Sequence, residues 1–595
     1  MKRSNVNRSM AALAAVGVLL TGCSGGDDDA GPPGSAGEQS SDVGGIFDTN
    51  DEGRDDRDGG DDTVEEGGGD DESEFADKST AEAPVSSDDA GDANDETTFE
   101  PANGDTSSDG AATAGAPERG SRDAEGGLFG AAEPADDLDA DRTEGNTFED
   151  YGYRDFVDAA DDPESTFALD VDTGSFSIAR RWLAEGTLPP RESVRPEEYV
   201  NAFEYDYDAP RDGLELTVDG GPSPFDDDNV LVRIGVQGEI VDDRDRGAAA
   251  LTFVIDTSGS MDRDDRLGLV KESLSILVDE LDDDDTVAIV TYDDNSGVVL
   301  EPTSVRDRGE ILDAIERLRP GGSTNLEAGL RQGYALADDA FRRGGINRVV
   351  LASDGVANVG VTDPDQLARM IRDDADRGIN LVTVGFGMGN FNDVTMEQLA
   401  DQGDGFYAYV DTEDEAERLF EDELTSTLLT IAKDAKIQVV FDPEIVDSYR
   451  LIGFENRGVL DRDFRNDDID AGELGSGHQV TALYDVELRR GVTLDDRGDI
   501  GEVFLRWEDP DDGEVVEIDE DIDLRDIEER WGDTELDFQL ATVVAVFAEI
   551  MRENPYAGDV DIDDLVDEVD RLADDLDDRE IDDLADLIER AAELR

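Results

Sequence analysis

Three short segments of the sequence combine carboxylates and hydroxyls in a pattern that suits the binding of a metal ion. They are Asp256-Thr257-Ser258-Gly259-Ser260, Gly321-Gly322-Ser323-Thr324-Asn325 and Ser353-Asp354-Gly355. Oxygen ligands without histidine or cysteine favour Mg²⁺, Mn²⁺ or Ca²⁺ over zinc. Because few of these ligands are carboxylates, the bound ion would stay electrophilic and would accept an acidic ligand from a partner protein.

The apolar runs beside these segments predict the sheet that would bring them together. Ala250–Ile255 precedes the first segment, and Arg348–Ala352 precedes the third. From residue 250 to residue 432 such runs alternate with amphipathic helical patterns, which is typical of an α/β fold with a doubly wound, mostly parallel sheet. Sheets of this kind bind ligands at the carboxyl ends of their strands. We therefore expect Asp256 and Asp354 to lie at one crevice.

This combination of residues resembles the metal-ion-dependent adhesion site of von Willebrand factor type A (VWA) domains. The resemblance rests on the D-x-S-x-S motif, a later threonine and a later aspartate. It implies a Rossmann-like α/β domain in which the hydroxyls of Ser258, Ser260 and Thr324 contact the ion. It also implies that Asp256 and Asp354 hold the ion directly or through water, and that an Asp or Glu of a partner completes the coordination.

Strand patterns on both sides of this region predict that it is inserted into a β-rich domain. Leu214–Val218 and Val230–Val236 precede it, and strand patterns return at Lys436–Phe441 and Val480–Leu488. Flanking segments such as STFALDVDTGSF, IGFENR and ENPYAGD are similar to those that bracket this domain in a family of bacterial surface lipoproteins.

The predicted organisation has seven parts. They are 1–22, a lipoprotein signal peptide; 23–146, a disordered acidic tether; 147–212, an N-terminal helical segment; 213–249, the first part of the β-rich domain; 250–432, the VWA domain; 433–533, the second part of the β-rich domain; and 534–595, a C-terminal helical region. The C-terminal helices carry apolar residues at helical spacing, so they either pack against their own domain or bind a partner. Their acidic face argues against binding to an anionic membrane.

The N-terminus predicts a lipid anchor. Lys2, Arg3 and Arg8 precede an apolar run, Met10–Leu20, that is too short to span a bilayer. The following Leu20-Thr21-Gly22-Cys23 resembles the bacterial lipobox, which implies cleavage before Cys23 and transfer of a diacylglyceryl group to its thiol. We therefore expect an extracytoplasmic protein that is lipid-anchored to the cell membrane or cell surface.

The charge of the chain is strongly negative. Its 155 acidic and 50 basic side chains give a formal net charge of −105, which excludes nucleic-acid binding through a basic face. The tether is rich in Gly, Asp, Ser, Ala and Glu and cannot bury enough apolar surface to fold. Residues 147–595 still hold 117 acidic and 41 basic side chains, which predicts a halophilic protein. The alternative is an acidic surface for cation or partner binding.

Enzyme classes explain the motifs less well. Asp172-Thr173-Gly174-Ser175 and Asp256-Thr257-Ser258 each resemble an aspartic-protease loop, but that fold is all-β and Asp256 precedes a helical pattern. We interpret Asp172–Ser175 as a strand-to-helix turn with Thr173 or Ser175 near the N-cap. Gly385-Phe386-Gly387-Met388-Gly389 lacks dinucleotide-binding spacing and is expected to form a loop. The single histidine, His478, is expected to lie in a loop beside a strand.

The sequence therefore predicts a non-enzymatic protein that mediates adhesion or assembly through Mg²⁺, or through Mn²⁺ or Ca²⁺, with a protein ligand that offers an Asp or Glu carboxylate. The alternative is a structural envelope or assembly factor in which the cation only stabilises the fold. The identity of the partner and the oligomeric state do not follow from the sequence.

If the acidic surface is adapted to salt, the melting temperature should rise steadily as KCl or NaCl is added up to molar concentrations. Molar salt screens charges beyond about 3 Å and so relieves the self-repulsion of the folded part. Scanning calorimetry in a salt series measures this dependence, and a melting temperature that does not rise would contradict the prediction.

Overall fold

The computed structural model describes residues 148–595 except 227, 243, 245, 355–363, 388–392, 423, 468, 470, 495, 511–512 and 559. The predicted signal peptide, the lipidation site at Cys23 and the tether to residue 146 lie outside the described residues. Within the part that the structure describes, no helix has the length and apolar character needed to cross a bilayer.

A six-stranded sheet forms the centre of the predicted VWA region. Its strand order is β10-β9-β8-β5-β6-β7, and every neighbouring pair is parallel except β6 and β7. The strands are β5 (Ala249–Asp256), β6 (Thr286–Tyr292), β7 (Ser296–Ser304), β8 (Ile346–Ser353), β9 (Asn380–Phe386) and β10 (Tyr407–Val410). Every residue of β5, β8 and β9 is buried, as expected for central strands that are covered on both faces.

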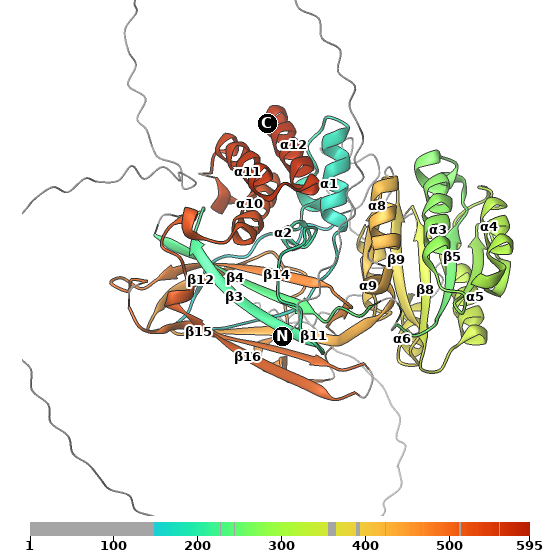
Figure 1. The fold of residues 1–595 in the computed structure, drawn as a ribbon, viewed down its shortest axis with the longest axis horizontal. Coiled ribbons are helices and arrows are strands. Elements are labelled where there is room, and N and C mark those ends of the chain that lie inside the picture. Colours follow the sequence, from blue (N-terminus) through green and yellow to red (C-terminus); the bar gives the residue numbers. More distant parts are fainter. Residues whose placement is uncertain are drawn as a thin grey trace, which may run out of the picture. The chain divides into compact units, whose positions relative to one another are not determined.

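Helices cover both faces of this sheet (Figure 1). One face packs against α3 (Leu269–Glu280), α4 (Arg308–Glu316), α8 (Glu413–Glu417) and α9 (Leu424–Leu428). The other packs against α5 (Leu326–Ala340), α6 (Pro364–Ala375) and α7 (Asp393–Asp401). Alternate residues of β5 explain the division, because Phe253 contacts the first set and Val254 the second. The predicted doubly wound fold is confirmed.

Two further sheets pack face to face and enclose a second core. The first has the order β1-β12-β14-β4-β3, and the second has the order β13-β11-β15-β16 with β2 also paired to β11. Their strands are β1 (Val157–Asp158), β2 (Glu164–Ala168), β3 (Leu214–Pro222), β4 (Asn229–Gly238), β11 (Thr430–Phe441), β12 (Val446–Ile452), β13 (Gly472–Gly475), β14 (Gln479–Leu488), β15 (Asp499–Glu508) and β16 (Val515–Asp523). The α/β region connects β4 of one sheet to β11 of the other, so it is inserted into a β-rich domain as predicted.

The N-terminal segment differs from the prediction of helices alone. It contains α1 (Gly174–Ala184) and α2 (Pro196–Val200), but it also adds β1 to the first sheet and β2 to the second. These strands are two and five residues long, and their partners lie more than 250 positions later in the chain. A pattern this short gives no reliable period, and the pairing that stabilises it is entirely non-local.

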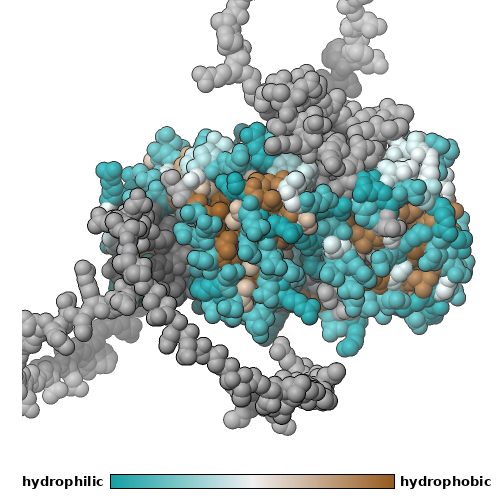
Figure 2. All heavy atoms as spheres, turned by 90° about the horizontal axis from the view of Figure 1, so that it is seen from above, coloured by the Kyte–Doolittle hydropathy of each residue, from teal (hydrophilic) through white to brown (hydrophobic). Residues whose placement is uncertain are grey.

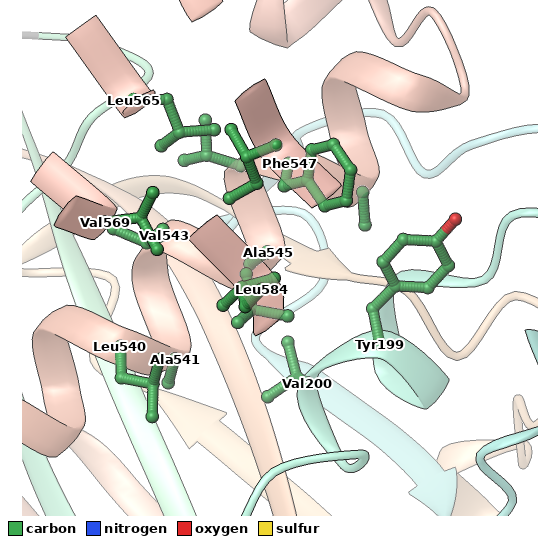
Figure 3. Close-up of a cluster of buried hydrophobic side chains, with 14 of the residues drawn as sticks. Tyr199, Val200, Leu540, Ala541, Val543, Ala545, Phe547, Leu565, Val569 and Leu584 are labelled. Atoms are coloured by element: carbon green, nitrogen blue, oxygen red, sulfur yellow. The ribbon is translucent and has the colours of Figure 1, made fainter. Parts of the chain in front are cut away.

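The C-terminal helices pack against their own domain. They are α10 (Leu536–Met551), α11 (Ile562–Leu576) and α12 (Arg579–Leu594). All residues of α10 from Phe538 onwards are buried, in a core shared with α1, α2, α11, α12 and one face of the sheet that contains β4 and β14; Figure 3 shows part of this core. The apolar faces of α11 and α12 point toward this core with Leu565, Val569 and Leu584. The aspartates of both helices lie on the opposite, exposed faces.

Truncation of the central side chain of this core should destabilise the protein. Phe547 of α10 is fully buried, and its ring lies 6.0 Å from that of Tyr199, so Phe547→Ala should lower the free energy of unfolding by about 3–5 kcal/mol. Denaturant unfolding in molar salt measures the loss. Asp574→Asn on the exposed face of α11 is the control and should change little, and equal stabilities of the two variants would contradict the packing described.

Candidate metal site

Two of the predicted segments lie side by side at the carboxyl ends of adjacent strands. β5 ends at Asp256, and its parallel neighbour β8 ends at Ser353, directly before Asp354. The Ser353 hydroxyl donates a hydrogen bond to Asp256 Oδ2 over 3.1 Å. The sheet therefore brings both carboxylates to one edge, as the strand pattern predicted. Gly355 of the third segment lies outside the described residues.

Backbone hydrogen bonds join the second segment to the first. The Gly259 N–H donates to the Gly322 carbonyl over 3.1 Å, and the Gly321 N–H donates to the Thr257 carbonyl over 2.7 Å. Gly322 has a φ of +84°, and a Cβ there would lie 2.9 Å from the Cβ of Asp293, so the close approach requires glycine. The structure thus brings all three segments together.

Thr324 lies between two anchored neighbours. Asp294 accepts hydrogen bonds from the backbone and the hydroxyl of Ser323, over 3.1 and 2.6 Å. The Asn325 side chain accepts from the Ala328 N–H over 3.1 Å and so caps α5. Thr324 itself is 5% exposed, so its position is fixed by the loop on one side and by the helix on the other.

Asp256 is a buried carboxylate with few donors. It accepts the Ser258 N–H over 2.7 Å at Oδ1 and the Ser353 hydroxyl at Oδ2. Burial raises the pKa of Asp256 to about 6; the charge of Asp354 acts in the same direction, and the hydrogen bonds from Ser258 oppose it. The hydroxyls of Ser258 and Ser260 lie 2.9 Å apart beside it.

Asp354 is fully buried, and only one of its two carboxylate oxygens has a hydrogen-bond partner among the described residues. Its Oδ2 accepts from Arg266 Nη1 over 2.5 Å, whereas its Oδ1 has no hydrogen-bond partner in the described structure. Such an oxygen is costly unless a donor or a cation meets it. This carboxylate oxygen and the neighbouring hydroxyls form the hard-oxygen donor set that Mg²⁺, Mn²⁺ and Ca²⁺ prefer. The residues therefore fit a divalent cation.

The site depends on hydroxyl ligands as well as carboxylates. Among the residues that the structure describes, no group of three or more His, Cys, Asp or Glu side chains is arranged to hold a metal. An ion here would be held by Asp256 and Asp354 together with Ser258, Ser260 and Thr324. Two carboxylates only just balance the charge of a divalent ion, so the remaining protein ligands would be neutral oxygens.

Arg266 is the site residue that the sequence analysis missed. It lies in a π-helical segment, Asp264–Gly268, and is 4% exposed. Its Nη1 donates to the Ser260 carbonyl over 2.8 Å as well as to Asp354. Two convergent carboxylates indicate that a nearby cation is needed, but spacing does not tell which arginine after the motif turns inward.

Asp172 has a structural role between domains. Its Oδ1 accepts from the Tyr407 N–H over 2.9 Å, and its Oδ2 pairs with Arg457 at 3.0 Å. Burial, followed by the charge of Asp170, raises the pKa of Asp172 well above its ordinary value, although Arg457 opposes this. The partners of Asp172 are therefore separate from those of Asp256, unlike the shared proton of a protease dyad.

The predicted turn before α1 is present with Thr173 at the N-cap, as expected, but the hydrogen bonds at the start of the helix come from other residues. Thr173 occupies the N-cap position without a side-chain capping bond. Glu198 of α2 accepts the Ser175 N–H over 2.7 Å, and the Ser175 hydroxyl donates to the Ser193 carbonyl over 2.6 Å. A carboxylate from another helix thus satisfies the start of α1.

His478 lies in the turn before β14, beside a strand as expected. Its Nδ1 accepts from the Gly475 N–H over 3.0 Å, and its ring meets Phe406 edge to face. Burial lowers the pKa of His478 to about 4, so the ring is neutral near pH 7.

The fold and these residues define a VWA domain. Residues 250–422 match the family model described as von Willebrand factor type A domain, a class generally involved in protein interactions. Residues 142–233 match a model described as von Willebrand factor, and residues 426–594 match one described as the C-terminal region of the uncharacterized protein YfbK.

The chain is similar to the uncharacterized protein YfbK from Escherichia coli (strain K12), of which it spans less than two thirds. The two are 40% identical over 339 residues, which cover 55% of this chain and 59% of YfbK. The uncharacterized protein sll0103 from Synechocystis is 28% identical over 300 residues, covering 48% of this chain and 67% of that protein. The solved von Willebrand factor type A structure from Catenulispora acidiphila is 17% identical and covers 58% of this chain and 81% of that one, with a TM-score of 0.37.

The raised pKa of Asp256 predicts a stability effect in metal-free protein. The folded state binds this proton more tightly than the unfolded state, so wild type loses stability as the pH rises from about 4 through about 6. Asp256→Asn removes this loss, which amounts to about 3 kcal/mol above pH 6. Thermal melts in EDTA near pH 4 and near pH 7 measure this effect. The melting temperature of the variant, relative to that of wild type, should be higher at pH 7 than at pH 4. An equal difference at both pH values would contradict the assignment.

Proposed function

We propose that the protein mediates divalent-cation-dependent protein–protein adhesion or assembly as a binding module, without catalysing a reaction. The observation that carries this proposal is the buried, unpartnered Oδ1 of Asp354 at a sheet edge shared with Asp256 and the hydroxyls of Ser258 and Ser260. The membership of these residues in a VWA domain supports it further.

In this mechanism a bound Mg²⁺, or Mn²⁺ or Ca²⁺, supplies an electrophilic position for a carboxylate oxygen. Asp256 and Asp354 contribute negative charge, whereas Ser258, Ser260 and Thr324 contribute neutral oxygens. The backbone bonds between the loops keep these groups in place before a ligand arrives, so little ordering entropy is lost on binding. An Asp or Glu of the partner completes the coordination.

The proposed location is the outer side of a cell membrane. The lipobox-like sequence ending at Cys23 supports a lipid anchor, and the acidic stretch to residue 146 would separate the folded part from the membrane. A tether of this kind lets the metal site reach proteins at a distance from the bilayer.

The second candidate is a structural envelope or assembly factor in which the cation only stabilises the fold. It is favoured by the partly buried ion pairs that join the VWA domain to its neighbours, such as Arg457–Asp401 and Lys433–Asp404, both 2.9 Å. Capture of surface proteins with and without EDTA, together with melting curves in the same buffers, separates the two functions. Loss of partner at an unchanged melting temperature favours adhesion.

Removal of one neutral ligand should weaken binding of the partner. Thr324→Ala deletes a buried hydroxyl of the site, so capture of a crosslinked partner from intact cells should fall several-fold even at saturating cation, and EDTA should abolish it. Thr303→Ala on β7 is the control, because the Thr303 hydroxyl lies outside the candidate site and donates to the carbonyl of Glu301, two residues away. Binding retained in EDTA would contradict the mechanism.

A further inference from the structure

Arg266 adds a positive charge to a site that the sequence assigns to oxygen ligands alone. Its guanidinium contacts Asp354 Oδ2 at 2.5 Å and the carbonyl of Ser260 at 2.8 Å. Both contacts are to residues of the candidate metal site. The arginine is therefore close enough to change how the site attracts a cation.

The Arg266 side chain is held in place along its length. Its aliphatic part packs over Gly387 at the end of β9, where an added Cβ would lie 2.5 Å from Arg266 Cγ. Gly387 has a φ of +74°, so this position requires glycine for its backbone conformation as well as for the arginine. This packing explains one glycine of the Gly385–Gly389 segment, which lacks dinucleotide-binding spacing.

The segment that carries Arg266 is anchored from outside the VWA domain. Asp265 pairs with Arg181 of α1 at 2.9 Å and with Arg263 at 3.0 Å. π-helical segments such as Asp264–Gly268 are rare in proteins. Those that occur are often found at functional sites. Because the guanidinium is buried, packed and hydrogen-bonded, it is a fixed part of the site.

The charges then determine what the site favours. Asp256 and Asp354 contribute two negative charges and Arg266 one positive charge, so the site is singly negative without an ion and singly positive with a divalent ion. Without Arg266 the loaded site would be neutral. Arg266 therefore lowers the attraction of the empty site for a cation, and it makes the loaded site attract an anionic ligand more strongly.

We infer that Arg266 is a specificity-determining positioning residue that weakens the hold of the site on the free cation and strengthens the affinity of the loaded site for a carboxylate ligand. This inference rests on the proposed function, because it assumes that the five oxygen ligands bind a divalent cation. Arg266 itself contacts neither the ion nor the ligand; it acts through Asp354, whose Oδ1 it leaves available.

The test uses the folded protein in molar KCl, where non-specific binding of cations to the acidic surface is screened. Mn²⁺ titrations followed by electron paramagnetic resonance measure the affinity for the ion. Water-proton relaxation of the Mn²⁺-loaded protein during addition of acetate measures the affinity for a carboxylate. Arg266→Met should bind Mn²⁺ about tenfold more tightly than wild type and acetate several-fold more weakly.

Two variants separate charge from structure. Arg266→Lys retains the charge and should match wild type in both titrations. Arg266→Gln removes the charge but keeps a donor for Asp354; it should behave as Arg266→Met and replaces that variant if the latter does not fold. A residue with only a structural role would lower the affinity for Mn²⁺, so the opposite signs of the two changes identify the charge effect.

The possible failures are distinguishable. If wild type binds Mn²⁺ and Asp354→Asn does not, but neutral variants of Arg266 bind the ion no more tightly than wild type, the inference is overturned and the proposed function stands. A lysine variant that behaves like the neutral ones also overturns the inference. If wild type, Asp354→Asn and the neutral variants all bind Mn²⁺ equally or not at all, both the metal site and the inference are overturned.

Discussion

The largely buried ion cluster around Arg457 is the contact on which the arrangement of the folded part depends. Arg457 follows β12 of the β-rich domain, and it binds Asp170 and Asp172 of the N-terminal segment at 2.9 and 3.0 Å. It also binds Asp401 at 2.9 Å and Glu397 at 3.3 Å, both in α7 of the VWA domain. These carboxylates hold the pKa of Arg457 well above its ordinary value, although burial opposes this. Because removal of one partner from a buried pair costs about 3–5 kcal/mol, this cluster fixes three parts of the chain to one another.

The ion cluster also determines the position of α1, and α1 in turn contacts the segment beside the candidate metal site. α1 begins two residues after Asp172, and its Arg180 pairs with Glu415 of α8 at 2.9 Å. The next residue, Arg181, pairs with Asp265, the neighbour of Arg266. The same helix packs its apolar side into the core around α10. The segment that bears Arg266 is thus held by the VWA sheet on one side and by α1 on the other, which would position Arg266 before any ligand binds.

The parts of this structure that the sequence predicted are those determined by local chemistry. Strand period and D-x-S-x-S spacing together place Asp256 and Asp354 at adjacent strand ends, and the sheet has that order. The short β2 escaped prediction because its partner is distant in the chain. Arg266 escaped for another reason: Arg263 lies closer to the motif in the sequence, but it is Arg266, in the π-helical segment, that contacts Asp354. The ion cluster at Arg457 joins the flanking segments STFALDVDTGSF and IGFENR, which the sequence identified only by their similarity to other proteins. Ion pairs between domains produce no periodic pattern in a sequence, so these contacts could not be predicted.

The acidic surface of the protein should repel the acidic ligand that we propose, and the charges of the candidate site would offset this repulsion. Residues 147–595 carry 117 acidic and 41 basic side chains, and hydrophilic residues cover much of the described surface on the face in Figure 2. Such a surface repels a carboxylate at low salt, whereas molar salt limits this repulsion to about 3 Å. Salt does not screen the attraction between charged groups that are in direct contact within this distance. The ion between Asp256 and Asp354, with Arg266 beside it, would supply positive charge over that short range. We therefore expect the protein to bind an acidic partner where salt screens its surface and where Arg266 would leave the loaded candidate site positive.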